Sequence, residues 1–170
     1  DMTGYTVSLP SNRWELWPLL ESDRMANPVL REFYKERDVV MEERRMRYED
    51  HARGKIWEQL FANAYQAHPY GSPTIGWMYD IQYLTRADAE DFYKQFYVPA
   101  NAVVAIVGDV DAAVVLDKME RYFAKVPGGS VEPRVITEEP AQNGERRAVV
   151  HHDSEPSMAF AYHKPNPPHP

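Results

Sequence analysis

The sequence predicts an α+β fold in which helices pack on a mixed β-sheet. The first observation is a continuous apolar run at residues 102–108, whose length and uniform hydrophobicity are typical of a central strand covered on both faces. The second is a series of stretches in which apolar residues recur at helical spacing, as they do in amphipathic helices. The third is a group of shorter β-rich stretches, at 5–9, 147–151 and 158–163, which we expect to be further strands.

The length and composition suit one globular domain with a sizeable core, because the chain has 170 residues, of which 44% are hydrophobic and 26% are charged. We expect residues 1–170 to be a single, truncated domain. Within it the stretch 127–145, rich in proline, glycine and acids, is predicted to be an exposed connector. Both ends of the sequence are expected to be cuts through a larger protein, because each lies close to a predicted strand.

Charge and residue types exclude several classes of function. A formal net charge of −7 without a basic patch argues against a nucleic-acid partner, since phosphate binding needs a basic surface. No apolar run in the sequence is long enough to span a bilayer, so we expect no membrane partner. The sequence has no cysteine, so a disulfide and a thiolate zinc site are both excluded, and any metal must be held by His, Asp or Glu.

Helical stretches follow one another along most of the chain. In the second of them, Asn27 is the predicted N-cap and Pro28 the first helical residue. Asp111 is the predicted N-cap of the last. Between them, residues 68–76 contain two prolines and two glycines, which predict a loop that either packs on the core or contacts a substrate. By apolar spacing the predicted helices lie near 12–25, 28–50, 56–67, 86–97 and 112–123.

Two glutamates on the second predicted helix, Glu36 and Glu43, form the candidate site. They are seven residues apart, close to two helical turns, so their carboxylates point the same way. We expect both to face inward, because they share a helical stripe with the apolar residues Val29, Phe33 and Val40. Buried carboxylates need a compensating partner. The residues alone leave two partners open, either Arg44 or Arg47 in an ion pair, or a metal ion.

Six motifs occur in an order and spacing typical of one family. They are LESDRM (20–25), FYKERDVVMEE (33–43), HPYG (68–71), IGWMYDIQYLT (75–85), FYKQFYVPANAVVAIVGDVD (92–111) and YF (122–123). Together they resemble the pitrilysin/insulinase family of zinc metallopeptidases, which includes the mitochondrial processing peptidases. The resemblance covers most of the chain and is closest to the N-terminal, zinc-bearing half of bacterial members. It implies a half-domain of the processing-peptidase type.

The resemblance also implies a site. In that family zinc is held by two histidines of an inverted motif, His-x-x-Glu-His, whose glutamate is the general base, and by a glutamate on a later helix. Matched residue by residue, Glu43 corresponds to this third zinc ligand, and Glu36 to an acid that supports the site. The resemblance further implies a peptide substrate, a second homologous half-domain or subunit as partner, and, from the bacterial members, a periplasmic location.

The inverted motif occurs nowhere in the 170 residues. We therefore expect a longer parent protein to be a zinc metalloendopeptidase that hydrolyses peptides or small unfolded polypeptides. This chain alone is expected to supply one zinc ligand, to lack the general base, and to be inactive and free of zinc. Two alternatives stay open: a non-catalytic partner subunit that binds peptide or builds an assembly, and a scaffold in which Glu36 and Glu43 only pair with arginines.

Overall fold

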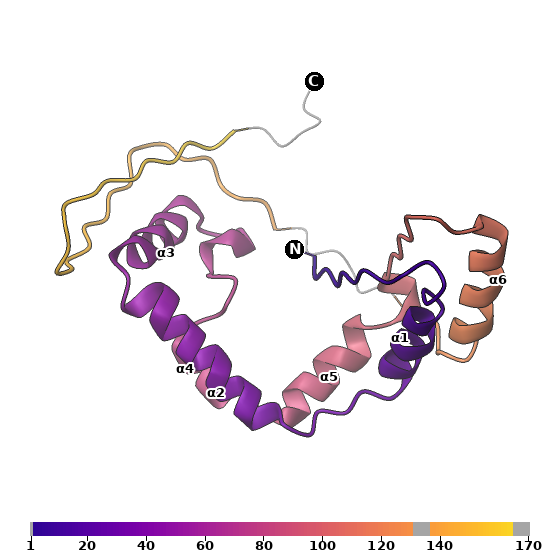
Figure 1. Cartoon of the computed structure of the whole chain (residues 1–170). Helices are drawn as coiled ribbons and strands as arrows, with labels where there is room; N and C mark the ends of the chain where they lie inside the picture. The colour runs from indigo at the N-terminus through magenta and orange to yellow at the C-terminus, as the bar shows by residue number, and fades with distance from the viewer. Residues whose placement is uncertain (1, 131–136, 165–170) are drawn as a thin grey trace. The chain divides into compact units, whose positions relative to one another are not determined.

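The structure of the chain, a computed structural model, describes residues 2–130 and 137–164 (Figure 1). Among the described residues no helix has the length and hydrophobicity needed to cross a membrane. The α-helices are α1 (Leu16–Ala26), α2 (Phe33–Arg44), α3 (Ala52–Ala64), α4 (Met78–Tyr83), α5 (Arg86–Phe96) and α6 (Ala112–Phe123). The other helical turns are the π-helix η1 (Arg45–Glu49) and the 3₁₀-helices η2 (Pro69–Gly71) and η3 (Pro99–Asn101).

The predicted mixed β-sheet is wrong, because no residue of the two described ranges lies in a strand. The apolar run 102–108 connects η3 to α6 without regular structure, and the side chains of Val103 and Val107 are 98% and 95% exposed. The stretch 158–163 is also irregular, with Tyr162 90% exposed. A strand needs a neighbour with which to exchange backbone hydrogen bonds, and within the described part of the chain these stretches have none. Apolar composition shows what a segment favours, but it does not supply the partner strand.

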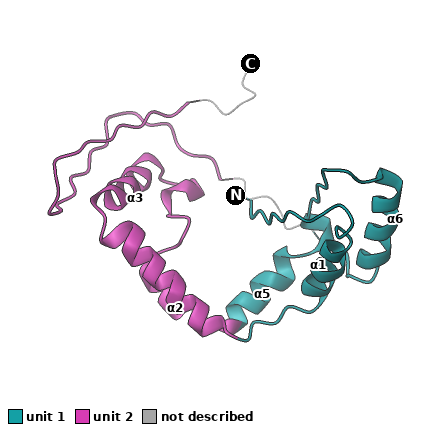
Figure 2. Cartoon of the chain, in the orientation of Figure 1, with its two compact units in different colours: residues 1–31, 87–133 teal, residues 32–86, 134–170 magenta. Residues whose placement is uncertain are grey.

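The chain divides into two compact units, each built from two separated stretches of sequence (Figure 2). Unit 1 consists of Asp1–Arg31 and Ala87–Pro133, and unit 2 of Glu32–Arg86 and Arg134–Pro170. Helices α1 and α6, with nearly all of α5, belong to unit 1, whereas α2, α3 and α4 belong to unit 2. Each unit is therefore formed by two segments that are far apart in sequence.

The predicted connector at 127–145 is described only in part, because residues 131–136 lie outside the described ranges. Residues 127–130 and 137–145 contain no helix and no strand. The role of this stretch as an exposed connector, and the organisation of residues 1–170 as one domain, both stay predictions.

In unit 1, α1 packs against α6 through apolar and charged contacts. The ring centroids of Trp17 and Phe123 are 6.4 Å apart. Glu15 lies directly before α1, and its Oε1 accepts hydrogen bonds of 2.8 Å from Lys118 Nζ and from Tyr122 OH. These two hydrogen bonds lower the pKa of Glu15. The carboxylate therefore joins the beginning of α1 to one face of α6.

Two features at helix beginnings follow from local sequence. The Oδ1 of Asp111 accepts hydrogen bonds from the backbone N–H groups of Ala113 and Val114, at 2.9 and 3.0 Å, so the predicted N-cap of α6 is confirmed. Pro18 is buried in the first turn of α1. The N–H that proline lacks would have no partner within the helix at this position, so the helix accommodates it.

The predicted beginning of the second helix is wrong. Asn27 ends α1 instead, because its backbone N–H and its side-chain amide both donate to Asp23, at 2.7 and 3.1 Å. Helix α2 begins later, at Phe33. Pro28 disfavours the helical conformation of the residue before it, so the Asn-Pro pair stops one helix rather than starting the next.

In unit 2, α2 packs against α4 and is continued by η1, which leads to α3. The N–H of Asp50 donates to the carbonyl oxygen of Arg45 at 2.9 Å and closes the wide π-turn. Gly54, in the first turn of α3, lies directly against this turn. A Cβ atom placed on Gly54 would be 1.9 Å from the carbonyl oxygen of Arg47. Glycine is therefore what allows η1 and α3 to approach so closely.

Replacing Gly54 by alanine should destabilise unit 2. The added methyl group would collide with backbone atoms of Arg47 and Tyr48, which cannot rotate away as the end of a side chain can. We expect the free energy of unfolding, measured by urea denaturation, to fall by about 1–3 kcal/mol, the usual cost of overpacking. Gly144→Ala is the matched control, because a Cβ atom there meets nothing within 4 Å. Equal losses in the two variants would contradict the close approach.

Candidate functional site

Both candidate site residues lie on α2, but their side chains differ in exposure. Glu36 is exposed, so the prediction that it faces inward is wrong. The apolar stripe behind that prediction was counted from Val29, which precedes α2 and is 69% exposed. The side chain of Glu43 is 37% exposed and lies near the C-terminal end of the helix. Seven residues of helix separate the Cα atoms of the two glutamates by about 10 Å along the axis. The roles of both residues stay predictions.

In the structure, the carboxylate of Glu43 forms an ion pair with an arginine. Its Oε1 lies 2.9 Å from Nη2 of Arg47, one of the two arginines that the sequence offered. The side chain of Arg47 is 69% exposed, and exposed ion pairs of this kind contribute roughly 0–1 kcal/mol. The ion pair with Arg47 therefore contributes little to the position of the Glu43 carboxylate.

The other arginine, Arg44, is buried and holds the C-terminal end of α2 in place. Its Nη2 donates to both carboxylate oxygens of Glu58 on α3, at 3.2 and 3.0 Å, and its Nη1 donates to the carbonyl oxygen of Gly76 at 2.9 Å. The guanidinium also lies 5.6 Å from the ring centroid of Trp77 and 5.4 Å from that of Tyr48. One cation therefore joins α2, α3, η1 and the loop before α4, directly beside Glu43. The sequence carries no periodic signal for the Arg44–Glu58 pair, because its members belong to different helices.

The loop at 68–76 packs on the end of α3, which is the first of the two roles that the sequence left open. Its His68 ring lies 5.4 Å from the ring of Tyr65 and 4.5 Å from that of Tyr70. The Nδ1 atom of His68 also accepts a hydrogen bond from the Tyr70 N–H, at 3.2 Å. These contacts direct the imidazole to neighbouring side chains and backbone within unit 2.

A carboxylate from much later in the chain holds the beginning of this loop. Oε1 of Glu139 accepts a hydrogen bond of 2.7 Å from the N–H of Gln66, and Oε2 accepts bonds of 2.8 Å from those of Ala67 and His68. The hydrogen bond from Gln66, with those from Ala67 and His68 and the charge of Arg146, lowers the pKa of Glu139 to about 2. Sequence reasoning missed this contact, because backbone N–H groups carry no residue-type signal.

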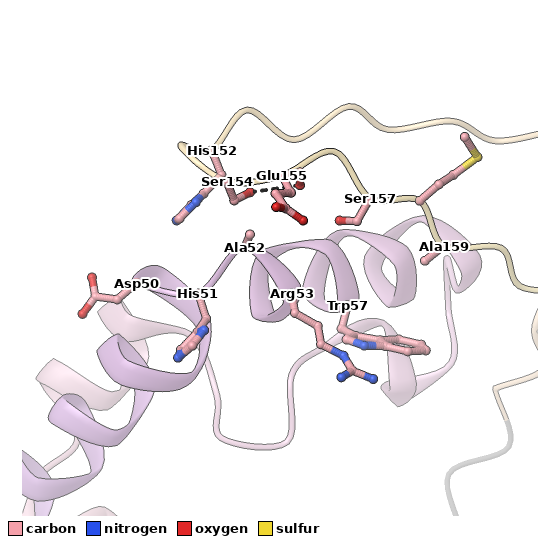
Figure 3. Close-up of a pocket in the computed structure, with 11 residues that line it drawn as sticks. Asp50, His51, Ala52, Arg53, Trp57, His152, Ser154, Glu155, Ser157 and Ala159 are labelled. Atoms are coloured by element: carbon pink, nitrogen blue, oxygen red, sulfur yellow. Dashed lines mark hydrogen bonds between the residues drawn. The ribbon is translucent and has the colours of Figure 1, made fainter.

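A pocket of about 540 Å³ lies between the beginning of α3 and the segment 152–159 (Figure 3). The Nδ1 atom of His152 is buried without a hydrogen-bond partner. Glu43 does not line this pocket, and within residues 2–130 and 137–164 no group of three His, Asp or Glu side chains is arranged to hold a metal ion. The pocket is therefore separate from the candidate residues on α2. The titratable side chains that line it are Asp50, His51, Arg53, His152 and Glu155.

A family profile and individual proteins of similar sequence all point to the same group of peptidases. The sequence profile described as "Peptidase M16 inactive domain" matches residues 83–170. The zinc protease PqqE of Helicobacter pylori is 40% identical over 157 residues, which cover 90% of this chain and 35% of that protein. A probable mitochondrial-processing peptidase subunit beta of Arabidopsis thaliana is 25% identical over 162 residues, which cover 94% of this chain and 30% of that protein.

The fold agrees with these sequence matches. The crystal structure of a protease from Helicobacter pylori superimposes with a TM-score of 0.73 at 35% sequence identity, over 84% of this chain and 35% of that one. The chain thus spans about a third of the length of the proteins that it resembles. The profile match begins after Glu36 and Glu43, which both lie outside it.

Replacing Arg44 by methionine should destabilise unit 2 strongly, because Glu58 would be left as a charge with a side chain only 14% exposed. Removing one partner of a buried pair costs about 3–5 kcal/mol. We expect this loss in urea denaturation of Arg44→Met, and a smaller loss in the double variant Arg44→Met/Glu58→Leu. The control is Arg45→Met, which breaks an exposed 2.9 Å pair with Glu42. A double variant as unstable as Arg44→Met would contradict this account.

Replacing Glu139 by glutamine should remove a contribution to stability that depends on pH. Because its pKa is about 2 in the fold against an ordinary value of 4.5, the contribution is fully present above pH 4.5 and is lost as the pH falls toward 2. The difference in melting temperature between the wild type and Glu139→Gln should therefore shrink across this range. The neighbouring exposed Glu138→Gln is the control, and a difference that is constant from pH 4.5 to 2 would argue against the assigned pKa.

Proposed function

Because the chain belongs to the pitrilysin/insulinase-type (M16) metallopeptidase family, we propose that it supplies one zinc ligand to a longer zinc-dependent endopeptidase. The substrates of that enzyme would be peptides or small unfolded polypeptides. The observation that carries the proposal is the position of Glu43. This carboxylate lies at the end of a helix that the buried Arg44 fixes, while its own partner is only the exposed Arg47.

The donor chemistry of Glu43 fits a zinc ligand. Zinc accepts carboxylate oxygens alongside imidazole nitrogens, and a catalytic site uses three protein ligands and leaves one position for water. When bound, zinc lowers the pKa of that water and so supplies a nucleophile at neutral pH. The His-x-x-Glu-His motif does not occur in the sequence, so in this proposal the two histidines and the general base come from outside these residues.

Two residues of α2 would have supporting roles. Arg44 fixes the end of the helix and so positions the Glu43 backbone. Glu36 lies about 10 Å from Glu43 along the helix axis. At this distance it acts on the site through its charge or through an intervening group, and not by direct contact with Glu43.

Replacing Glu43 by glutamine in the longer protein should lower zinc content and peptidase activity together, because the amide is a poor zinc ligand. Glu36→Gln should have the smaller effect, about 10–100-fold in zinc affinity, as is typical of residues that support a ligand. Zinc is measured by elemental analysis of the dialysed protein, and activity with an unstructured peptide. Glu42→Gln is the control, since Glu42 is exposed on the same helix and pairs with Arg45. Full zinc occupancy in Glu43→Gln would refute the ligand assignment.

The second candidate is a non-catalytic subunit or half that pairs with a catalytic homologue. It is supported by the description of the matching profile as an inactive domain, and by the subunit named among the relatives. The sequence before Asp1 in the parent protein separates the two candidates. An intact His-x-x-Glu-His motif there favours the enzyme, whereas a parent protein that folds without that motif and without zinc favours the partner.

A further inference from the structure

The three N–H groups that bind Glu139 lie in the link between α3 and η2. The last hydrogen bond at the end of α3 runs from the N–H of Tyr65 to the carbonyl oxygen of Phe61. The next three N–H groups, of Gln66, Ala67 and His68, have no partner within the helix and converge on one carboxylate at 2.7–2.8 Å. Successive backbone N–H groups that point to one place form a concave anion site. Here the geometry depends on the backbone and not on side chains.

The ligand of this site is carried by a segment that follows it by more than seventy residues. Glu139 is 71 to 73 residues later in the sequence than the N–H groups that it binds. The same segment has a second anchor, because Nη1 of Arg146 donates to the carbonyl oxygens of Asn63 and Ala64, at 2.8 and 3.2 Å. The carboxylate of Glu139 thus accepts hydrogen bonds from the N–H groups that follow α3. The guanidinium of Arg146 donates to carbonyl oxygens in the last turn of α3. The negative side chain therefore binds the backbone donors, and the positive side chain binds the backbone acceptors.

We propose that the backbone N–H groups of Gln66, Ala67 and His68 form a carboxylate-binding site, of which Glu139 is the resident, tethered ligand, and that a free carboxylate binds there when Glu139 is removed. The site is selective for a ligand that has both a negative charge and two acceptor oxygens. An ionised carboxylate presents two acceptor oxygens to three donors, whereas a neutral amide presents one oxygen and directs its own N–H groups at them. Glu139 is only partly buried, so a small ligand has access to the site.

Tethering determines when a free ligand can compete. A tethered group acts as if it were present at a millimolar or higher effective concentration. Wild-type protein should therefore show little response to a free carboxylate, and a variant without the Glu139 side chain should respond clearly. A carboxylate on another molecule, such as a peptide C-terminus, would bind only after the segment that carries Glu139 has detached.

The test is chemical rescue of Glu139→Ala. We expect this variant to melt at a lower temperature than the wild type, and acetate to raise its melting temperature in a saturable way. In NMR spectra acetate should shift the backbone amide signals of Gln66, Ala67 and His68. Acetamide, which has the same shape without the charge, and chloride at equal ionic strength should do neither. Amide signals that do not respond to acetate in folded Glu139→Ala would overturn the proposal.

Two further variants make the test specific. Glu138→Ala removes the exposed neighbouring carboxylate, so it should resemble the wild type in stability and should not respond to acetate. Glu139→Gln retains the size of the side chain if Glu139→Ala does not fold. We expect faster hydrogen exchange at the three amides in Glu139→Gln than in the wild type, and unchanged exchange there would show that the carboxylate is not their ligand.

Discussion

The buried guanidinium of Arg44 is the contact on which unit 2 most depends. It binds both oxygens of Glu58 on α3 and the carbonyl oxygen of Gly76, and it lies against the ring of Trp77. Because Glu58 belongs to α3, and Gly76 and Trp77 both belong to the loop before α4, the cation determines how α2, α3 and this loop meet. Glu43 directly precedes Arg44 on α2, so the position of the candidate ligand follows from that of Arg44.

The helices were largely predictable from the sequence, whereas tertiary partners were not. Asp111 predicted the beginning of α6, because an N-cap acts within its own turn of chain. Asn27 was misassigned because an Asn-Pro pair fits both the end of one helix and the start of another. The apolar run 102–108 favoured a strand, but a strand depends on a second segment that local composition does not specify.

In the candidate site, too, the sequence predicted local features but not the tertiary partners. Glu36 and Glu43 were found by their spacing, and their proposed roles come from a family resemblance that the sequence and structure comparisons support. The contact between Arg44 and Glu58 joins residues 14 positions apart on two helices and has no periodic signature. The contact of Glu139 is even harder to predict from the sequence, because its partners are backbone N–H groups, which every residue type except proline supplies.

The exposed run at 102–108 has a consequence for how residues 1–170 would behave in solution by themselves. It contains no charged residue and no proline, and the side chains of Val103 and Val107 are almost fully accessible. Segments with these properties pair with copies of themselves and promote aggregation. A net charge of −7 opposes such association by mutual repulsion, and added salt screens that repulsion. Colloidal stability should therefore be greatest in dilute solutions of low ionic strength.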